Sequence, residues 1–471
     1  MKSKFKKSAV LVLTAILAGT AFSCGKDKKE DISDSQVSDD NVGAAGTIKL
    51  ATMYAHHDQF YEAVKNFEES SGYNVEIIDY YEKYHDANSD AEGENIIKGA
   101  CDLLRKDMVS GRCPDIVCAE PSFMSDIADG YFTDLYALMD GSSVSRDDFL
   151  PNVLKGFERG GKLPMICTGV QFETAVAPTE IVGEDAENWS YSDARAAIDS
   201  LPEETNILGF SQYPINDLSG YMNEMLMHEV YINGIDDFKS TYLDNCDFLD
   251  RINITDDWEG EELEGNFFIS EVVFWGINSG ISQQLYYTLS DVSKEINYDI
   301  SDTGKTAKAI ENDLTFVGFP SSNGIGISIM YEYATEMYGI LENSENKKAA
   351  WDLLSGLFDV DYQTEMTVCE SGGIPVIDAA IDKAMEYTKW NSHSINSPFM
   401  TADGTEYYMG EEMKQQVADY IRRVELRPYY DTELDSIFRE ENLAVLAGEK
   451  SAEEAADMIE NRYNLYSAEK S

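Results

Sequence analysis

The first folded stretch of the chain, residues 47–80, has the pattern of a strand, a helix and a second strand. Residues 47–52 alternate polar and apolar side chains with a period of two, which is typical of a strand. Apolar side chains between Phe60 and Phe67 then recur at helical spacing, and residues 75–80 read as a strand again. Two strands joined through one helix are expected to be parallel neighbours. The opening of the chain therefore predicts an α/β fold.

A second helix over residues 97–108 and a third strand over residues 115–119 extend this pattern. The first lobe is therefore expected to be an open sheet covered by helices. In such sheets ligands bind outside the carboxyl ends of the strands. The loops at those ends are residues 53–58 and 120–122, so we expect both loops to face a ligand cleft.

Four residues of these two loops are candidate ligand contacts: Tyr54, His56, Asp58 and Glu120. Sugars bind through planar hydrogen-bonding groups and aromatic faces, which such side chains supply. Two structural alternatives stay open, because Asp58 also suits the N-cap of the following helix and Glu120 also suits a solvated loop. His56 and His57 are adjacent, and neighbours in a loop rarely chelate one ion, so no metal site is expected.

The N-terminus has the three parts of a secretion signal: a basic start at Lys2, an apolar run from Ala9 to Ala18, and small residues up to Cys24. The apolar run is too short for a bilayer span of about 20 residues. We expect a signal peptide over 1–23 and a lipidated (palmitate-bearing) Cys24 that opens a flexible tether over 24–46. The protein would then be anchored on the extracytoplasmic face of the cell membrane. The alternative is an ordinary secretion signal with an incidental cysteine.

The formal net charge of −51 excludes a nucleic-acid partner, because such a surface repels phosphate backbones. It favours a neutral or cationic solute over a polyanionic one. Cys101, Cys113 and Cys118 lie close enough in sequence to form a disulfide bridge, and buried free thiols are the alternative. Residues 47–471 are too many for one compact core, which favours two lobes.

Five segments resemble a known family in their order and spacing. They are the strand–helix–strand of 47–80; Pro-Asp-Ile-Val at 114–117 with Gly-Tyr-Phe-Thr-Asp-Leu at 130–135; Phe-Pro-Ser-Ser-Asn-Gly at 319–324; the helix 346–354 followed by Tyr362-Gln363; and Gly-Gly-Ile-Pro-Val at 372–376. In these segments the chain resembles the extracellular solute-binding proteins of family 1, which are related to maltose-binding protein. The resemblance covers almost all of the chain beyond the tether.

This resemblance implies a two-lobed, periplasmic-binding-protein-like α/β fold of type II with the ligand cleft between the lobes. The N-terminal lobe would be residues 47–172 plus 338–380, and the C-terminal lobe residues 173–337 plus 381–471. The implied function is solute binding for an ABC importer: the lobes close on a mono- or oligosaccharide, which passes to the permease subunits. The resemblance implies neither an enzyme nor a cofactor.

Further ligand contacts follow from the resemblance. It puts the first crossing between the lobes at Gln171, Phe172 and Glu173, and a cleft position at Asn278 and Ser279 after a strand. Glu370, which lies beside the Gly-Gly pair, is a further candidate ligand contact. Tyr213 and Tyr221 are weaker candidates in a helical stretch rich in Met and Tyr.

The sequence departs from the family pattern at one position that bears on the choice of ligand. Family members often place a sugar-stacking tryptophan after the strand that matches residues 272–278, but residues 278–281 contain no aromatic side chain. Trp275 lies just upstream and belongs either to the cleft or to the strand core. The departure argues against a long malto-oligosaccharide but not against sugars.

Three other functions stay open. The acidic charge is compatible with a cationic or peptidic solute, and the same binding chemistry would serve a sensor subunit of a membrane kinase. An extracellular glycan-active enzyme would need two carboxylates facing each other at about 5–10 Å. With 87 acidic residues such pairs cannot be identified by spacing. No nucleophile elbow, zinc-protease motif or phosphate-binding loop is present in the sequence.

Overall fold

A computed structural model describes most of the chain beyond the tether. The described residues are 46–53, 56, 58–88, 94–119, 121–183, 189–201, 206–209, 222–223, 226–227, 229–230, 238–249, 266–269, 298–300, 306–310, 314–318, 320–322, 329–332, 337–366, 374–386, 399–400, 406–426 and 432–470. The predicted signal peptide, Cys24 and the predicted tether lie outside them, except for Gly46.

A five-stranded sheet forms the centre of the first part of the molecule, with strand order β2-β1-β3-β13-β4. Its strands are β1 Gly46–Thr52, β2 Tyr73–Asp79, β3 Ile116–Ala119, β13 Met337–Ile340 and β4 Ile166–Cys167. Strand β1 pairs in parallel with both β2 and β3, as the sequence predicted. Strand β13 returns from a distant part of the chain and pairs antiparallel with β3 and β4.

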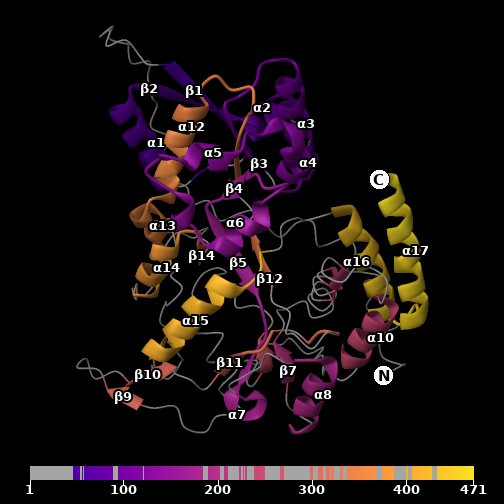
Figure 1. The fold of residues 1–471 in the computed structure, drawn as a ribbon. Coiled ribbons are helices and arrows are strands. Elements are labelled where there is room, and N and C mark those ends of the chain that lie inside the picture. Colours follow the sequence, from indigo (N-terminus) through magenta and orange to yellow (C-terminus); the bar gives the residue numbers. More distant parts are fainter. Residues whose placement is uncertain are drawn as a thin grey trace.

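Helices cover both faces of this sheet (Figure 1). One side carries α1 Asp58–Ser71 and α12 Lys347–Ser355, and the other carries α2 Tyr80–Ala87, α3 Glu94–Val109 and α4 Pro121–Tyr131. The connections from β1 to β2 and from β2 to β3 run in opposite directions across the sheet. Because each crossover is right-handed, their helices fall on opposite faces. The predicted helices over 60–67 and 97–108 are α1 and α3.

A buried carboxylate links the first two helices of the second face. Asp107 on α3 accepts hydrogen bonds from Tyr80 Oη (2.9 Å), Lys83 Nζ (2.9 Å) and the guanidinium of Arg112 (2.7 Å). Burial alone would raise the pKa of Asp107, but these three donors outweigh it and hold the pKa below its usual value. The ionised form is therefore the one that the fold stabilises.

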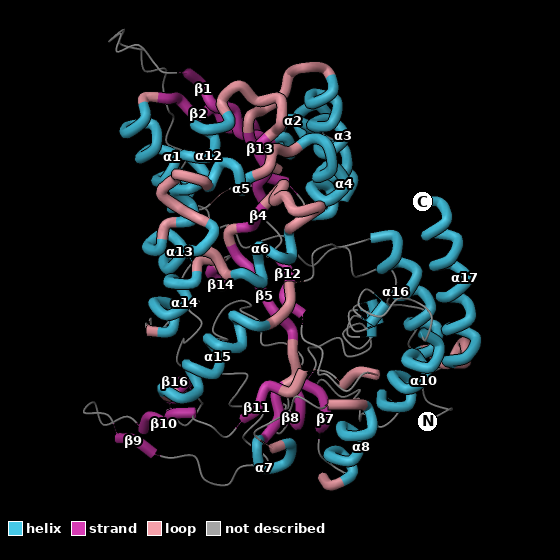
Figure 2. Tube along the Cα trace, viewed as in Figure 1, coloured by secondary structure: helices cyan, strands magenta, loops and turns pink. Residues whose placement is uncertain are grey.

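Three strands leave the five-stranded sheet as a second small sheet of order β12-β5-β14. They are β5 Gly169–Glu173, β12 Ile329–Glu332 and β14 Ile374–Pro375, and β5 pairs antiparallel with both others. Figure 2 shows β5 and β12 running side by side from the upper body of the molecule toward its lower body. Two segments far apart in the sequence therefore join the two bodies.

Short helices and 3-10 turns complete the upper body. They are α5 Leu135–Met139, η3 Arg146–Asp148, α6 Pro151–Phe157, η4 Gly356–Phe358, α13 Val360–Met366 and α14 Asp378–Met385. The longer helix α15 Glu411–Arg423 lies below α14 (Figure 1). Two-stranded pairs are formed by β6 Val176–Pro178 with β11 Leu314–Phe316, antiparallel, and by β7 Asn206–Gly209 with β8 Asn266–Ile269, parallel.

A further sheet has the order β15-β16-β10-β9, with strands β15 Phe399–Met400, β16 Glu406–Met409, β10 Thr306–Ile310 and β9 Tyr298–Ile300. The remaining helices are α7 Thr179–Val182, α8 Tyr191–Asp199, α10 Phe238–Leu249, α16 Thr432–Leu446 and α17 Ala452–Lys470. The helical stretch expected around Tyr213 and Tyr221 is helical at the described positions 222–223, 226–227 and 229–230.

The buried apolar side chains form two separate cores, and β6 lies on their boundary. Val176 belongs to the first core, which contains the five-stranded sheet, whereas Ala175 and Ala177 belong to the second core with α8, α10, α16 and α17. Alternate side chains of a strand point to opposite faces, so one strand serves both cores. The first core also includes Val417 and Ile421 of α15. The domain limits predicted from the sequence end that lobe at residue 380, and they stay a prediction.

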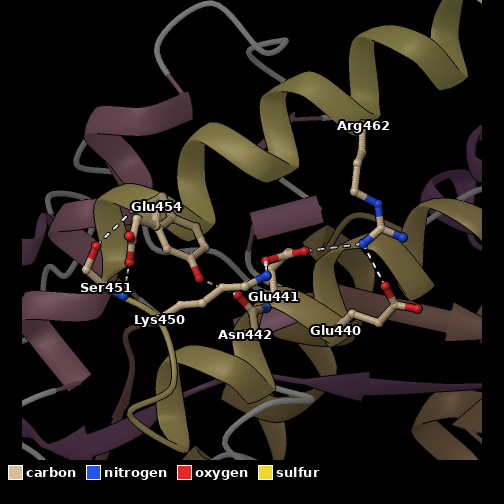
Figure 3. Close-up of polar contacts among 8 residues, drawn as sticks. Glu440, Glu441, Asn442, Lys450, Ser451, Glu454 and Arg462 are labelled. Carbon is tan, nitrogen blue, oxygen red and sulfur yellow. Dashed lines mark hydrogen bonds and ion pairs between the residues drawn. The ribbon is translucent and has the colours of Figure 1, made fainter.

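Helices α16 and α17 are held together by a buried carboxylate and a cap (Figure 3). Glu441, which is 3% exposed, pairs with Lys450 and with Arg462 Nη1. The Ser451 amide donates to Glu454 Oε2 (3.0 Å), and the Glu454 amide donates to Ser451 Oγ (3.2 Å). This is a reciprocal capping box. The backbone and side-chain hydrogen bonds from Ser451 lower the pKa of Glu454.

Five cysteines lie in the described part of the chain, and no disulfide joins any of them: Cys101, Cys113, Cys118, Cys167 and Cys246. A bridge among Cys101, Cys113 and Cys118 is therefore not formed in this structure. Cys118 on β3 and Cys167 on β4 are separated by β13, about 10 Å across two strand spacings. Disulfide geometry needs Cα atoms within about 7 Å. Among the helices that the structure describes, none has the length and apolarity to cross a bilayer.

Candidate ligand cleft at the crossing strands

At the carboxyl ends of β1 and β3, the helices that connect the strands change from one face of the five-stranded sheet to the other. Thr52 at the end of β1 is in register with Cys118 of β3, so the two strands end at the same edge. The helix after β1 covers one face, and α3, which leads into β3, covers the other. In open α/β sheets ligands bind at this switch point, outside the carboxyl ends. The predicted loops 53–58 and 120–122 follow these two ends.

The crossing strands leave from the same edge of the sheet. Met337, the first residue of β13, pairs with Ala119 at the end of β3 and with Cys167 at the end of β4. Strand β12 leads into Met337, and β5 follows Cys167 after one residue. The switch-point edge is therefore also the edge from which the molecule continues into its lower body.

Gln171, Phe172 and Glu173 lie on β5, where their backbones pair with Tyr331, Met330 and Ile329 of β12. The segment that the resemblance implied as the first crossing is thus a strand of the pair that joins the two bodies (Figure 2). Ligand contact by these three residues stays a prediction.

A fully buried glutamine fastens the upper end of the crossing strands. Gln363 on α13 donates from Nε2 to the carbonyls of Thr168 and Leu357, both at 2.9 Å, and accepts from the Val376 amide at 2.9 Å. Thr168 directly precedes β5, and Val376 directly follows β14. One side chain therefore fixes the bases of two neighbouring strands through both ends of its amide. The sequence singled out Gln363 only as part of the resemblance.

The lower end of β5 is fixed by α15. Thr174 Oγ1 lies 2.5 Å from Tyr420 Oη, and both residues are buried. The Tyr420 ring stacks on Phe316 of β11 with centroids 4.5 Å apart. The next residue, Ile421, and Val424 just after the helix are attached to α6, because Asn152 Nδ2 donates to their carbonyls (2.8 and 2.7 Å). The C-terminal end of α15 thus links the end of β5 and the β6–β11 pair to α6 of the first core.

Of the two predicted residues of the first loop that the structure describes, His56 is enclosed by other side chains. It is 9% exposed, and its ring stacks on Phe60 with centroids 3.8 Å apart and an interplanar angle of 21°. The Tyr338 ring on β13 is also nearly parallel to the His56 ring, with centroids 6.5 Å apart. Asp58 is exposed as the first residue of α1, where its charge favours the positive end of the helix dipole.

The other predicted contacts lie outside the described residues: Tyr54, Glu120, Tyr213, Tyr221, Trp275, Asn278, Ser279 and Glu370. Two described residues near the crossing were missed by the sequence argument. Tyr420 supports the crossing strand, and Tyr61, one residue after Phe60, is exposed beside His56. With 28 tyrosines in the chain, no spacing distinguishes these two.

A separate shallow pocket of about 340 Å³ lies on the upper body, built by α5, η3 and α6. Tyr136 Oη donates to Glu158 Oε1 at 2.8 Å, and the Arg146 guanidinium lies 3.8 Å from the Tyr136 ring centroid. Burial, together with the Glu158 carboxylate, raises the pKa of Tyr136. Tyr136, Glu158 and Arg146 of its lining are engaged with one another, and we assign the pocket no ligand role. Among the described side chains, no group of three or more His, Cys, Asp or Glu is arranged to hold a metal ion.

Two solved structures share this arrangement across nearly the whole chain. The cyclic α-maltosyl-1,6-maltose binding protein from Arthrobacter globiformis is 16% identical with a TM-score of 0.52, covering 89% of this chain and 98% of its own. The sugar-binding protein MalE from Xanthomonas citri is 14% identical with a TM-score of 0.55, covering 90% of this chain and 98% of its own.

This chain has the fold of these two binding proteins. The α/β, periplasmic-binding-protein-like fold expected from the sequence is therefore confirmed. At these identities the likeness establishes the fold alone. No protein-family model matches the sequence, and no curated protein sequence matches it.

Proposed function

We propose that this protein is a lipid-anchored, extracytoplasmic solute-binding subunit of an ABC importer and that its solute is a sugar. The observation that carries the proposal is the pair of crossing strands β5 and β12, which leave the sheet at its switch-point edge and join two cores. The same fold serves two proteins whose names state that they bind sugars.

The proposed mechanism is closure without chemistry on the ligand. A solute that contacts both bodies gains its full set of contacts only when they close around it. Its differential affinity then shifts the open–closed equilibrium, and the importer's permease subunits would read the closed shape. The predicted crossing residues Gln171 and Glu173 supply amide and carboxylate groups suited to sugar hydroxyls.

Binding is tested by a thermal-shift screen on the purified mature protein. The screen uses glucose, galactose, xylose, maltose, maltotriose, xylobiose and stachyose, with spermidine, arginine and a tripeptide as cationic and peptidic alternatives. A ligand at 100 times its dissociation constant stabilises by about 2.7 kcal/mol, which raises the melting temperature by a few degrees. We expect a saturable shift with one sugar class and recovery of that sugar unchanged.

Other outcomes separate the rival functions. A shift with spermidine, arginine or the tripeptide alone would keep the fold and reject the sugar, and the net charge of −51 makes a cationic solute the second candidate. Conversion of a bound oligosaccharide to shorter products would make the protein an enzyme. No shift with any compound would reject solute capture.

Anchoring is tested at the predicted lipidation site. We expect the parent protein to incorporate labelled palmitate and to sediment with membranes, and Cys24→Ala to do neither. Cys246→Ala removes a cysteine of the second core instead, and it is the matched control. Membrane association of Cys24→Ala equal to that of the parent would reject the lipid anchor. Co-purification with permease subunits separates an importer role from that of a kinase sensor.

A further inference from the structure

An aromatic column stands at the switch-point edge, and only its last ring is exposed. Tyr338, His56 and Phe60 are stacked in parallel and are at most 9% exposed. Tyr61 follows them on the first turn of α1 and is 46% exposed. Its ring stands at 80° to both neighbours, with centroids 6.3 Å from His56 and 5.6 Å from Phe60.

These contacts restrict the orientation of the Tyr61 ring. Perpendicular aromatic pairs are favourable at centroid distances of about 4.5–7 Å, and both of its pairs lie in that range. The helix fixes the position of its Cα, and two buried rings fix the plane of its side chain. An aromatic ring held in one orientation loses little conformational entropy when a ligand packs against it.

Its place in the fold distinguishes Tyr61 from the other exposed tyrosines. Tyr131, 38% exposed, ends α4 at the opposite edge of the sheet, where its carbonyl accepts from the Glu342 amide. Tyr81, 37% exposed, is the second residue of α2, after the outer strand β2. Tyr61 alone among these three contacts the loop that follows β1, one of the two strands of the switch point.

We propose that Tyr61 is a sugar-stacking residue of the ligand cleft. This inference rests on the proposed function. It names Tyr61 as the group that selects a pyranose ring with an apolar C–H face. Such a face packs on an aromatic ring while the hydroxyls around it hydrogen-bond to polar groups.

The test compares Tyr61→Ala, Tyr61→Phe and the matched control Tyr131→Ala by isothermal titration with the sugar that gives the largest thermal shift on the parent protein. We expect Tyr61→Ala to weaken binding about three- to tenfold, in keeping with the strength of aromatic packing. Tyr61→Phe keeps the ring and should bind within about twofold of the parent, as should Tyr131→Ala. Circular dichroism checks that all variants are folded.

A second readout reports on stacking directly. Sugar ring protons that lie over an aromatic face shift upfield in the proton spectrum, and this shift should be lost in Tyr61→Ala and kept in Tyr61→Phe. Sugar binding by Tyr61→Ala with the parent's affinity and an unchanged proton shift would overturn the inference and leave the proposed function intact. Failure of the parent itself to bind any sugar of the screen would overturn both.

Discussion

Gln363 offers the sharpest test of how the crossing strands are held. In Gln363→Met the side chain keeps its length but loses its three hydrogen bonds to Thr168, Leu357 and Val376. The Val376 amide then loses its only described partner in a fully buried setting, and an unsatisfied buried group costs about 1–3 kcal/mol. We therefore expect the free energy of unfolding to fall by about 2–4 kcal/mol. Gln363→Ala adds a cavity and should cost about 1 kcal/mol more.

Urea unfolding followed by circular dichroism measures this loss. Gln415→Met is the matched control, because Gln415 is exposed on α15 and bonds only Asp419 in the described structure. A surface substitution of this kind should stay within about 0.5 kcal/mol. If Gln363→Met were no more destabilising than Gln415→Met, the reasoning about a buried three-way anchor would be wrong.

The same variant separates a structural role from a positioning one. If Gln363 only stabilises the core, the folded variant binds sugar with the parent's dissociation constant. If it positions the base of β5, as the bonds to Thr168 and Val376 indicate, binding weakens even at temperatures where the variant is fully folded. Titration at 10–20 °C below the variant's melting temperature distinguishes these results.

Three other sites carry predictions. Gly156→Ala brings a Cβ to 2.4 Å from Leu426 Cδ2, so overpacking should cost about 1–3 kcal/mol in urea unfolding, and Leu426→Ala in the same chain should recover part of it. The lowered pKa of Asp107 stabilises the fold above the usual carboxylate pKa of about 4, and this contribution is lost as pH falls through the folded value. Asp107→Asn should therefore lower stability at pH 7 and flatten its loss in acid. Ser451→Ala removes the cap of α17 and should cost about 1 kcal/mol, whereas Ser467→Ala late in the same helix should cost little.

The local part of the fold was predictable because its signals are local. The period-two and period-3.6 patterns gave β1, α1, β2, α3 and β3 with boundaries within a few residues. One motif also has a physical explanation in the structure. Asp115, in Pro-Asp-Ile-Val, accepts from the Lys49 amide (2.9 Å) and the Ser344 hydroxyl (2.5 Å). It therefore ties the start of β3 to β1 and to the turn after β13.

The long-range part was not predictable from patterns. Strand β13 enters the first sheet more than 200 residues after β3, and α15 packs into the first core although it follows the last crossing strand. Periodicity reports only that such elements have an apolar face, and several partners would bury that face equally well. The exposure of Tyr61 and the contact between Tyr420 and Thr174 likewise depend on packing between distant segments.

The two fixed points of β5 also limit where the molecule bends. Thr168 is held by Gln363, and Thr174 is held by Tyr420, which belongs to a helix attached to the first core. Because β6 packs into both cores, the second core is not joined by a free linker. Closure then has to bend residues 169–173, which would separate Thr174 from Tyr420, or slide Phe316 along Tyr420. Bending places the motion in the segment that carries the predicted ligand contacts.

Amide hydrogen exchange distinguishes these two motions. If the bend lies in β5, a bound sugar contacts the moving segment itself. Exchange at residues 169–173 should then slow on binding, while the amides of residues 175–177, which stay packed between the two cores, keep their rates. Slowing confined to residues 174–177 and α15 would contradict the bend, and it would place the motion at the stack of Tyr420 on Phe316. In that case the ligand would act on closure through the boundary between the cores rather than through β5.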